Sequence, residues 1–237
     1  LAVDHIDLQI GSELFVFLGP NGAGKTTTIK MLTGLLRPNE GQVKINGIDI
    51  SADPLRAKAQ FGFVPEQPHL YEKLTPTEFI DFIINIYNAP YEESVRRMQQ
   101  LFEIFEVDDR AHEAMEDFSN GMKKKMSIIA ALVHQPKILF LDEPTAALDP
   151  KAARNLKDIL RGLVNRGSSV FLTTHVLETA EHMCDRVGII NKGELCAIGA
   201  LDDLRREHGA GLSLEDLFLK LTGEAFTSKV DEFLQEQ

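Results

Sequence analysis

The segment 19–26 constrains the fold of this chain more than any other, because it spells G-x-x-x-x-G-K-T between an apolar run and a helical pattern. The run at 14–18 predicts a buried strand, and the spacing of the apolar residues behind the motif predicts a helix that reaches Leu36. Such a match arises by chance in about one chain in a hundred of this length. Successive backbone N–H groups between a strand and a helix converge as phosphate oxygens require. The sequence therefore predicts a phosphate-binding loop rather than an ordinary glycine turn.

The side chains of this loop predict a nucleotide triphosphate with magnesium. Lys25 is placed to reach the β- and γ-phosphates as a point charge, and the Thr26 hydroxyl is placed to ligate Mg²⁺. The glycines let the backbone approach the phosphates closely. The candidate phosphate-binding residues are Gly19, Pro20, Asn21, Gly22, Ala23, Gly24, Lys25, Thr26 and Thr27.

A second apolar run, at 137–141, ends in Asp142 and Glu143. A buried parallel strand delivers acids in this way at its carboxyl edge. Asp142 is expected to serve the Mg²⁺, and Glu143 to orient and deprotonate an attacking water. Seen without the phosphate loop, the same pair reads equally well as two solvated carboxylates before a proline turn.

The order of the remaining patterns predicts an α/β fold with a mainly parallel sheet. A strand is expected at 169–174, ending at His175, and the alternation at 3–10 predicts another. The period-two stretch at 43–50 is broken by Asn46-Gly47, so we expect a hairpin and a flanking antiparallel β subdomain.

The domain organisation follows from where these patterns change. Helical periodicity from about 75 to 133 predicts an inserted α-helical subdomain, and a chain of 237 residues holds one large domain with such an insert. We expect one domain at 1–223 and a C-terminal helical extension at 224–237.

The charge balance limits the partners. With 36 acidic and 25 basic residues, the formal charge of −11 argues against broad binding to nucleic acid or to an anionic membrane. No apolar run approaches the roughly 18 residues of a membrane span, and we expect no signal peptide. Because the first residue is Leu1, we expect the natural N-terminus to lie upstream.

Two cysteines, Cys184 and Cys196, stand far apart and form no C-x-x-C pair. They offer neither a disulfide framework nor a zinc ribbon. We expect two reduced, buried thiols.

Three further motifs resemble those of the ATP-binding subunits of ABC transporters. They follow one another along the chain in the order found in that family. Residues 118–122 are similar to the family signature Leu-Ser-Gly-Gly-Gln with three positions altered. Residues 147–149 resemble its D-loop, and His175 resembles its switch histidine. The signature keeps the Ser119 hydroxyl for a helix N-cap, and Gly121 lacks a Cβ where a phosphate would approach.

The resemblance implies a P-loop NTPase fold whose phosphate loop is the Walker A motif. It implies hydrolysis of Mg-ATP by a head-to-tail dimer with a second ATP-binding subunit, identical or related, that sandwiches two nucleotides. It further implies transmembrane permease subunits as partners, no nucleic acid, and a cytoplasmic position on the inner face of the cell membrane. The form of the signature resembles that of exporter subunits for drugs, lipids or polysaccharides.

By the same resemblance, individual residues receive roles. Glu143 is implied as general base, His175 as the group that holds the γ-phosphate and positions the water, and Asp149 as the link across the dimer. Contacts to ATP across the dimer are implied for Ser119, Gly121, Met122 and Asp149.

The stretch 62–71 is similar to the family's Q-loop but departs from it. Glu66 stands where the usual glutamine is found and Gln67 follows, so either side chain could sense Mg²⁺. The family's adenine-stacking residue is expected to lie before Ala2.

Two groups of residues keep two interpretations each. Lys123, Lys124 and Lys125 form either a solvated helix face, which we favour, or direct phosphate contacts. Phe79 and Ile83 are expected in the core. For Tyr71, a place in the core and a place on a docking surface for the membrane subunit are equally favoured. The alternative function is a soluble ATPase of the same superfamily that acts in assembly or regulation of a protein complex.

Overall fold

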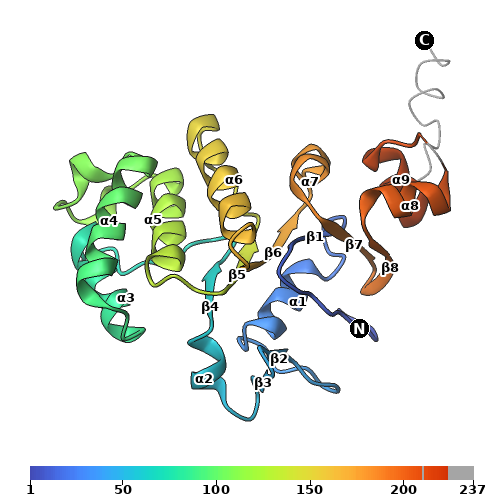
Figure 1. Cartoon of the computed structure of the whole chain (residues 1–237), viewed down its shortest axis with the longest axis horizontal. Helices are drawn as coiled ribbons and strands as arrows, with labels where there is room; N and C mark the ends of the chain where they lie inside the picture. The colour runs from blue at the N-terminus through green and yellow to red at the C-terminus, as the bar shows by residue number, and fades with distance from the viewer. Residues whose placement is uncertain (210, 224–237) are drawn as a thin grey trace.

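The computed structural model describes residues 1–209 and 211–223, so the predicted helical extension at 224–237 lies outside the described residues. The described part forms a six-stranded sheet in the order β4-β5-β6-β1-β7-β8 (Figure 1). Neighbours pair in parallel except for β7 and β8, which are antiparallel, as predicted for a mainly parallel sheet. The strands are β1 (Leu14–Leu18), β4 (Phe61–Val64), β5 (Ile138–Asp142), β6 (Ser169–Thr174), β7 (Arg186–Asn191) and β8 (Glu194–Gly199).

The central strand β1 is buried along its whole length. Leu14, Val16 and Leu18 face one apolar cluster, and Phe15 and Phe17 face the other. A parallel strand covered on both faces must therefore be apolar at every position, which explains why this run does not alternate.

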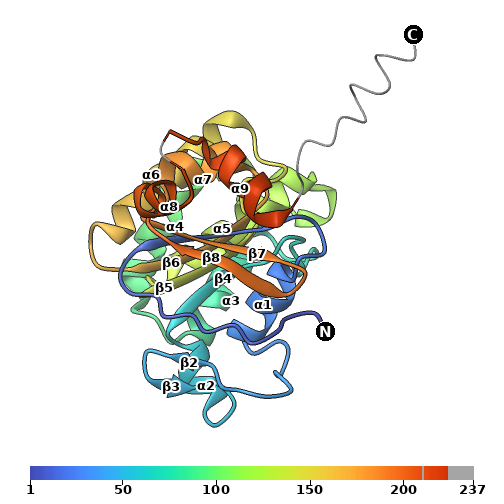
Figure 2. The same cartoon turned by 90° about the vertical axis from the view of Figure 1, so that its right-hand side faces the viewer.

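Helices cover both faces of the sheet. Helices α6 (Pro150–Val164) and α7 (Leu177–Met183) lie on one face, and α1 (Lys25–Leu32) lies on the other (Figure 2). Helices α8 (Leu201–His208) and α9 (Leu214–Thr222) follow β8 at one end of the molecule (Figure 1). No helix within the described ranges is both long enough and apolar enough to cross a bilayer.

The predicted hairpin is present and small. Strands β2 (Lys44–Ile45) and β3 (Ile48–Asp49) form a separate antiparallel sheet, followed by the short helix α2 (Pro54–Lys58). Asn46 and Gly47 have φ angles of 53° and 79°, as a two-residue hairpin turn with right-handed twist requires.

The predicted helical segment lies at the opposite end from α8 and α9 (Figure 1). It comprises α3 (Pro76–Ile86), α4 (Tyr91–Phe105), the 3₁₀ turns η1 (Asp108–Arg110) and η2 (Met115–Asp117), and α5 (Asn120–Val133). A capping box between Thr75 and Glu78 starts α3. The division into a domain at 1–223 with an insert at about 75–133 stays a prediction.

Three expectations were wrong, and two strands were not predicted. Residues 3–10 form no strand, although Ile6, Leu8 and Ile10 pack on an apolar cluster, because the segment is half-buried without a pairing partner. Helix α1 ends at Leu32 rather than near Leu36, since the left-handed Gly34 turns the chain at φ 66°. Strands β7 and β8 were not among the predicted elements. Cys196 is exposed and Cys184 half-buried, although both thiols are free.

Candidate active site

Four strand ends meet at one edge of the sheet. Parallel strands in the order β4-β5-β6-β1 bring their carboxyl ends together, with the glycine loop after β1, Glu143 after β5 and His175 after β6 (Figure 1). The residues that the sequence placed in separate motifs therefore converge in space.

The glycine loop holds its lysine on its own carbonyl groups. Lys25 is only 7% exposed, and its Nζ donates to the carbonyl oxygens of Gly19 at 2.6 Å and Pro20 at 3.1 Å. Burial lowers the pKa of the Lys25 ammonium, and the carboxylates of Glu143, Asp142 and Glu66 oppose that shift. Lys25 is thus a buried cation at the start of a helix, held by carbonyl oxygens and close to three acidic side chains.

Gly24 is required where the loop becomes the helix. It is the N-cap of α1 with φ 111°, and a Cβ there would stand 2.5 Å from the carbonyl oxygen of Ala2. Any L side chain at this position meets both backbone strain and a clash. Thr26 and Thr27 are half-buried on the first turn of the helix.

The two acids at the carboxyl end of β5 are buried, which excludes the interpretation as solvated carboxylates. Asp142 is 2% exposed and Glu143 is 8% exposed. Asp142 Oδ1 accepts a hydrogen bond from the hydroxyl of Thr173, the residue directly opposite it on β6. That bond fixes the carboxylate beside the phosphate loop.

Glu143 and His175 form a pair. Glu143 Oε1 lies 2.8 Å from Nδ1 of His175, and Oε2 accepts from the Thr174 hydroxyl at 3.2 Å. The His175 side chain is 59% exposed, so one end of the pair faces solvent. Glu143 also has φ 45°, a conformation that non-glycine residues adopt mainly under constraint. A carboxylate held in this way has the surroundings of a general base.

The sequence reasoning missed Thr173 and Thr174. Both are buried and each supports one of the two acids. The signal for them was two polar residues at the carboxyl end of an otherwise apolar strand, next to the strand that ends in the acids.

The signature segment caps α5 as predicted, with Ser119 Oγ accepting from the backbone N–H of Met122 at 3.3 Å. Packing within the chain itself also favours glycine at position 121. A Cβ there would stand 2.6 Å from the carbonyl oxygen of Ala147. The helix start and the D-loop-like segment are therefore packed backbone to backbone.

Asp149 is engaged within its own subunit. It caps α6 by accepting from the Ala152 N–H at 2.8 Å, and it pairs with Lys125 Nζ at 2.8 Å. The Lys125 bond, followed by the Ala152 bond, lowers the pKa of Asp149. Its implied contact across a dimer stays a prediction.

The interpretation of the three lysines as a solvated helix face was wrong. Lys124 is 1% exposed, and its Nζ donates to the carbonyl oxygens of Pro65, Glu66 and Asp142. Lys123 pairs with Glu72 at 2.6 Å. Burial lowers the pKa of Lys124 to about 8. This face of α5 packs on the loop after β4 and on the end of β5.

The loop after β4 exposes the two candidate sensors, Glu66 and Gln67, and does not distinguish between them. Phe79 is in the core, as expected, and Ile83 is half-buried against it. Tyr71 is 61% exposed and stands edge-on to Phe82 with ring centroids 5.4 Å apart. This gives an exposed aromatic pair beside the loop.

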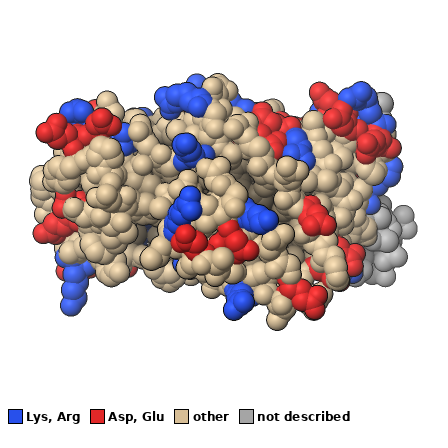
Figure 3. Space-filling view, turned by 60° about the horizontal axis from the view of Figure 1, so that its bottom comes forward, with Lys and Arg blue, Asp and Glu red and all other residues tan. Residues whose placement is uncertain are grey.

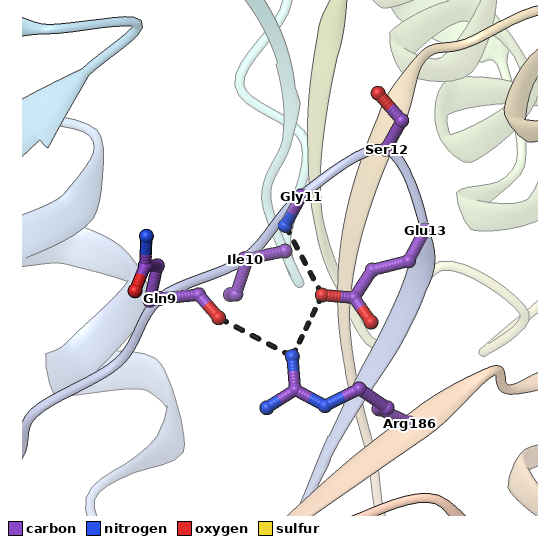
Figure 4. Close-up of a pocket in the computed structure, with 6 residues that line it drawn as sticks. All are labelled: Gln9, Ile10, Gly11, Ser12, Glu13 and Arg186. Atoms are coloured by element: carbon purple, nitrogen blue, oxygen red, sulfur yellow. Dashed lines mark hydrogen bonds and ion pairs between the residues drawn. The ribbon is translucent and has the colours of Figure 1, made fainter.

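Other surface features lie apart from this edge. A hollow of about 560 Å³ lies at the amino ends of β1 and β7, where Arg186 donates to Glu13 at 2.9 Å (Figure 4). On the face drawn in Figure 3, basic and acidic side chains are interspersed rather than gathered into one basic area. Neither feature adds to the site.

The chain resembles known proteins in sequence and in fold. Residues 3–146 match the family model described as ABC transporter. The linearmycin resistance ATP-binding protein LnrL of Bacillus subtilis is 38% identical over 214 residues, which cover 90% of this chain and 68% of LnrL.

Two solved structures share the fold. One, described as an ATP binding subunit of an ABC transporter, has a TM-score of 0.90 at 36% identity and is matched over 93% of both chains. The other is a dimeric ATP-binding cassette in a post-hydrolysis state bound to ADP and Pi. It has a TM-score of 0.76 at 27% identity, with 84% of this chain and 90% of that chain covered.

Proposed function

This chain belongs to the ABC transporter family of ATP-binding proteins, and from that premise we propose that it binds Mg-ATP at the polar strand edge and hydrolyses it to ADP and phosphate. The observation that carries the proposal is the contact between the buried Glu143 and the exposed His175, 2.8 Å apart, beside the loop that holds Lys25. Base, phosphate-binding cation and positioning histidine converge at one point, as phosphoryl transfer requires.

The chain's own residues have separate tasks in this reaction. Glu143 accepts the proton of the attacking water, and Thr174 holds its second oxygen so that the carboxylate keeps one orientation. His175 holds the γ-phosphate. Lys25 and the amides of the loop bind the β- and γ-phosphates.

The residues present fit magnesium bound together with a nucleotide. In the described part of the chain, no group of three or more His, Cys, Asp and Glu side chains could hold a metal ion. Thr26 and Asp142, with Glu66 or Gln67, offer oxygen donors, and Mg²⁺ characteristically combines a few such donors with phosphate oxygens and water. When bound, the ion neutralises charge on the phosphates.

A second ATP-binding subunit, identical or related, completes each site in this proposal. Ser119, Gly121 and Met122 at the start of α5, with Asp149, would contact the ATP held by the partner, because a helix N-terminus favours anions. A dimeric ATP-binding cassette is among the structures of similar fold.

ATP binding and hydrolysis by the chain drive export through transmembrane permease subunits. LnrL, the relative described above, is named for resistance to linearmycin. The exposed pair of Tyr71 and Phe82 offers an aromatic surface to such a subunit. The chain would then sit on the cytoplasmic face of the cell membrane through its partners.

The test of hydrolysis is Glu143→Gln. The amide keeps the shape of the side chain but accepts no proton, so we expect turnover to fall about 100-fold or more while ATP is still bound. The variant should accumulate as a dimer with ATP in size-exclusion chromatography. Glu194→Gln, on the exposed surface of β8, is the control and should keep wild-type turnover. An unchanged rate in Glu143→Gln would show that the base is misassigned.

The test of transport is purification of the tagged chain from a detergent extract. Recovery of a polytopic membrane protein is expected. Recovery of soluble partners alone would favour an ATPase that acts in assembly or regulation of a protein complex.

A further inference from the structure

Lys124 is the most deeply buried charged side chain among the described residues, at 1% exposure. Its Nζ donates to the carbonyl oxygens of Pro65 at 2.8 Å, Glu66 at 3.0 Å and Asp142 at 3.2 Å. An ammonium has three hydrogens to donate, so these three bonds use all of them. The ammonium therefore joins α5 to the loop after β4 and to the end of β5.

Lys124 differs from the neighbouring Lys123 and Lys125 in the groups that its ammonium binds. Lys123 and Lys125 pair with the carboxylates of Glu72 and Asp149 at the surface. Lys124 instead binds neutral main-chain oxygens in the interior, where a charge is expensive to bury. The carboxylates of Asp142, Glu66 and Glu143 lie near enough to favour the charged ammonium, but its three hydrogen bonds all go to carbonyl groups and fix their direction.

One of those carbonyls belongs to the peptide unit that joins Asp142 to Glu143. Lys124 Nζ donates to the oxygen of this peptide unit, and the N–H of the same unit, which belongs to Glu143, donates to the carbonyl oxygen of Thr173 at 3.1 Å. Hydrogen bonds on both sides therefore hold the plane of this peptide unit next to Glu143, whose φ angle is 45°. A non-glycine residue in this region is strained and persists only where its surroundings enforce it.

We propose that Lys124 is a positioning residue that sets the orientation of Glu143 and ties that orientation to α5 and to the loop after β4. The inference rests on the proposed function, because it concerns the base of that reaction. Lys124 touches neither nucleotide nor water in this account. It acts through the backbone of Asp142 and Glu143.

The position of Lys124 on α5 gives the link a consequence for the dimer. Ser119 and Gly121 lie in the first turn of the same helix and are proposed to contact the partner's nucleotide. A displacement of α5 would carry Lys124 with it and turn the peptide that orients Glu143. One helix would thereby connect the partner's nucleotide site to the base of its own site.

The test is Lys124→Met in the full chain, which removes the donors and keeps an unbranched apolar side chain. We expect kcat to fall about 10- to 100-fold, the cost of a misplaced reacting group, with Kd for a fluorescent ATP analogue changed by less than about threefold. Lys123→Met, on the same helix, is the matched control and should keep the wild-type kcat. An unchanged kcat in Lys124→Met, or a Kd that worsens in parallel with kcat, would overturn the positioning role.

Lys124→Gln serves as the second variant and decides the question if the methionine variant does not fold. Its amide can donate to some of the same carbonyls, so its kcat should lie between those of Lys124→Met and the wild type, again with Kd retained. A kcat equal to that of the wild type, or a joint loss of kcat and ATP binding, overturns the proposal.

The Glu143→Gln variant distinguishes a failure of the proposed function from a failure of the positioning role alone. If that variant keeps its turnover, the proposed function fails. If it loses turnover while Lys124→Met keeps it, only the positioning role fails.

Discussion

Helices α1 and α5 each carry a buried lysine within their first turns, but their N-termini are capped differently. The N-cap of α1 is Gly24, which offers no side-chain cap, whereas Ser119 caps α5. The first turn of α1 therefore has no side-chain cap and is proposed to bind a ligand, whereas Ser119 satisfies one N–H of α5 within its own chain.

The two lysines repeat the contrast. Lys25 bonds to carbonyls five and six residues before it, inside its own loop. The carbonyls bound by Lys124 are 18, 58 and 59 residues away, on other elements. Loss of the Lys25 bonds would affect only its own loop, which agrees with its proposed role as a phosphate ligand, whereas loss of the Lys124 bonds would release two other elements. In this chain, the sequence distance to the partners separates a lysine proposed to bind a ligand from a lysine that joins elements.

The sharpest way to break this contrast is Lys25→Ala. We expect affinity for a fluorescent ATP analogue to fall at least about 100-fold, or about 3 kcal/mol, because charge-assisted bonds to phosphate are lost. Lys30→Ala, on the exposed side of α1, is the control and should bind normally. Unchanged affinity in Lys25→Ala would refute the role given to the lysine.

Gly121→Ala tests whether the start of α5 is packed against its own chain. The added Cβ would press on the Ala147 carbonyl, so the free energy of unfolding should fall by about 1–3 kcal/mol in urea denaturation. Gly162→Ala, on α6 with no atom near the added Cβ, should be neutral or stabilising. Equal stability of both variants would mean that the close approach to Ala147 is unimportant.

The other end of α5 gives a pH test. His134 follows the helix and stacks on Tyr87 at 3.7 Å, and burial lowers its pKa from 6.5 to about 4. Between these values the unfolded chain binds the proton and the folded chain does not, so stability is full above pH 6.5 and is lost as pH falls toward 4. We expect about 1–2 kcal/mol less stability at pH 5 than at pH 7 from this group.

The check is urea denaturation of His134→Phe at both pH values. Phenylalanine keeps a ring against Tyr87 and takes no proton, so the difference between pH 5 and pH 7 should shrink by that amount. His112→Gln, at an exposed position, should leave the difference unchanged. A wild-type pH response in His134→Phe would contradict the assignment.

Ser119→Ala has the smallest expected effect. Loss of the cap on α5 should lower the free energy of unfolding by about 1 kcal/mol, and Ser119→Asn, which can still cap, should restore it. ATP affinity of the isolated subunit should not change, because Ser119 is proposed to serve the partner's nucleotide. A weakened affinity in the isolated subunit would place Ser119 in its own site.

The sequence predicted the elements around the site well where the signal was local. The buried runs became β1, β5 and β6, Asn46-Gly47 became a hairpin turn, and Ser119 became a helix cap. It failed where pairing or packing over distance decided the outcome. Residues 3–10 alternate without a partner strand, and Lys124 looks solvent-facing until the loop after β4 covers it.

The sequence placed the candidate site residues at the ends of three buried runs, which are β1, β5 and β6, but it did not predict how their side chains meet. Thr173 and Thr174 were missed because their role depends on the register of β6 against β5. Gly121 was assigned to an approaching phosphate, and its contact with Ala147 comes from a segment far along the chain.

The strand, glycine loop and helix around Lys25 could be predicted from the residues alone, because their hydrogen bonds and backbone angles join residues close along the chain. The contact of Glu143 with His175, and the bond from Lys124 to the carbonyl group before Glu143, could be found only in the folded chain. Those contacts join residues 32 and 18 positions apart. Packing of whole elements, rather than local conformational preference, brings such residues together.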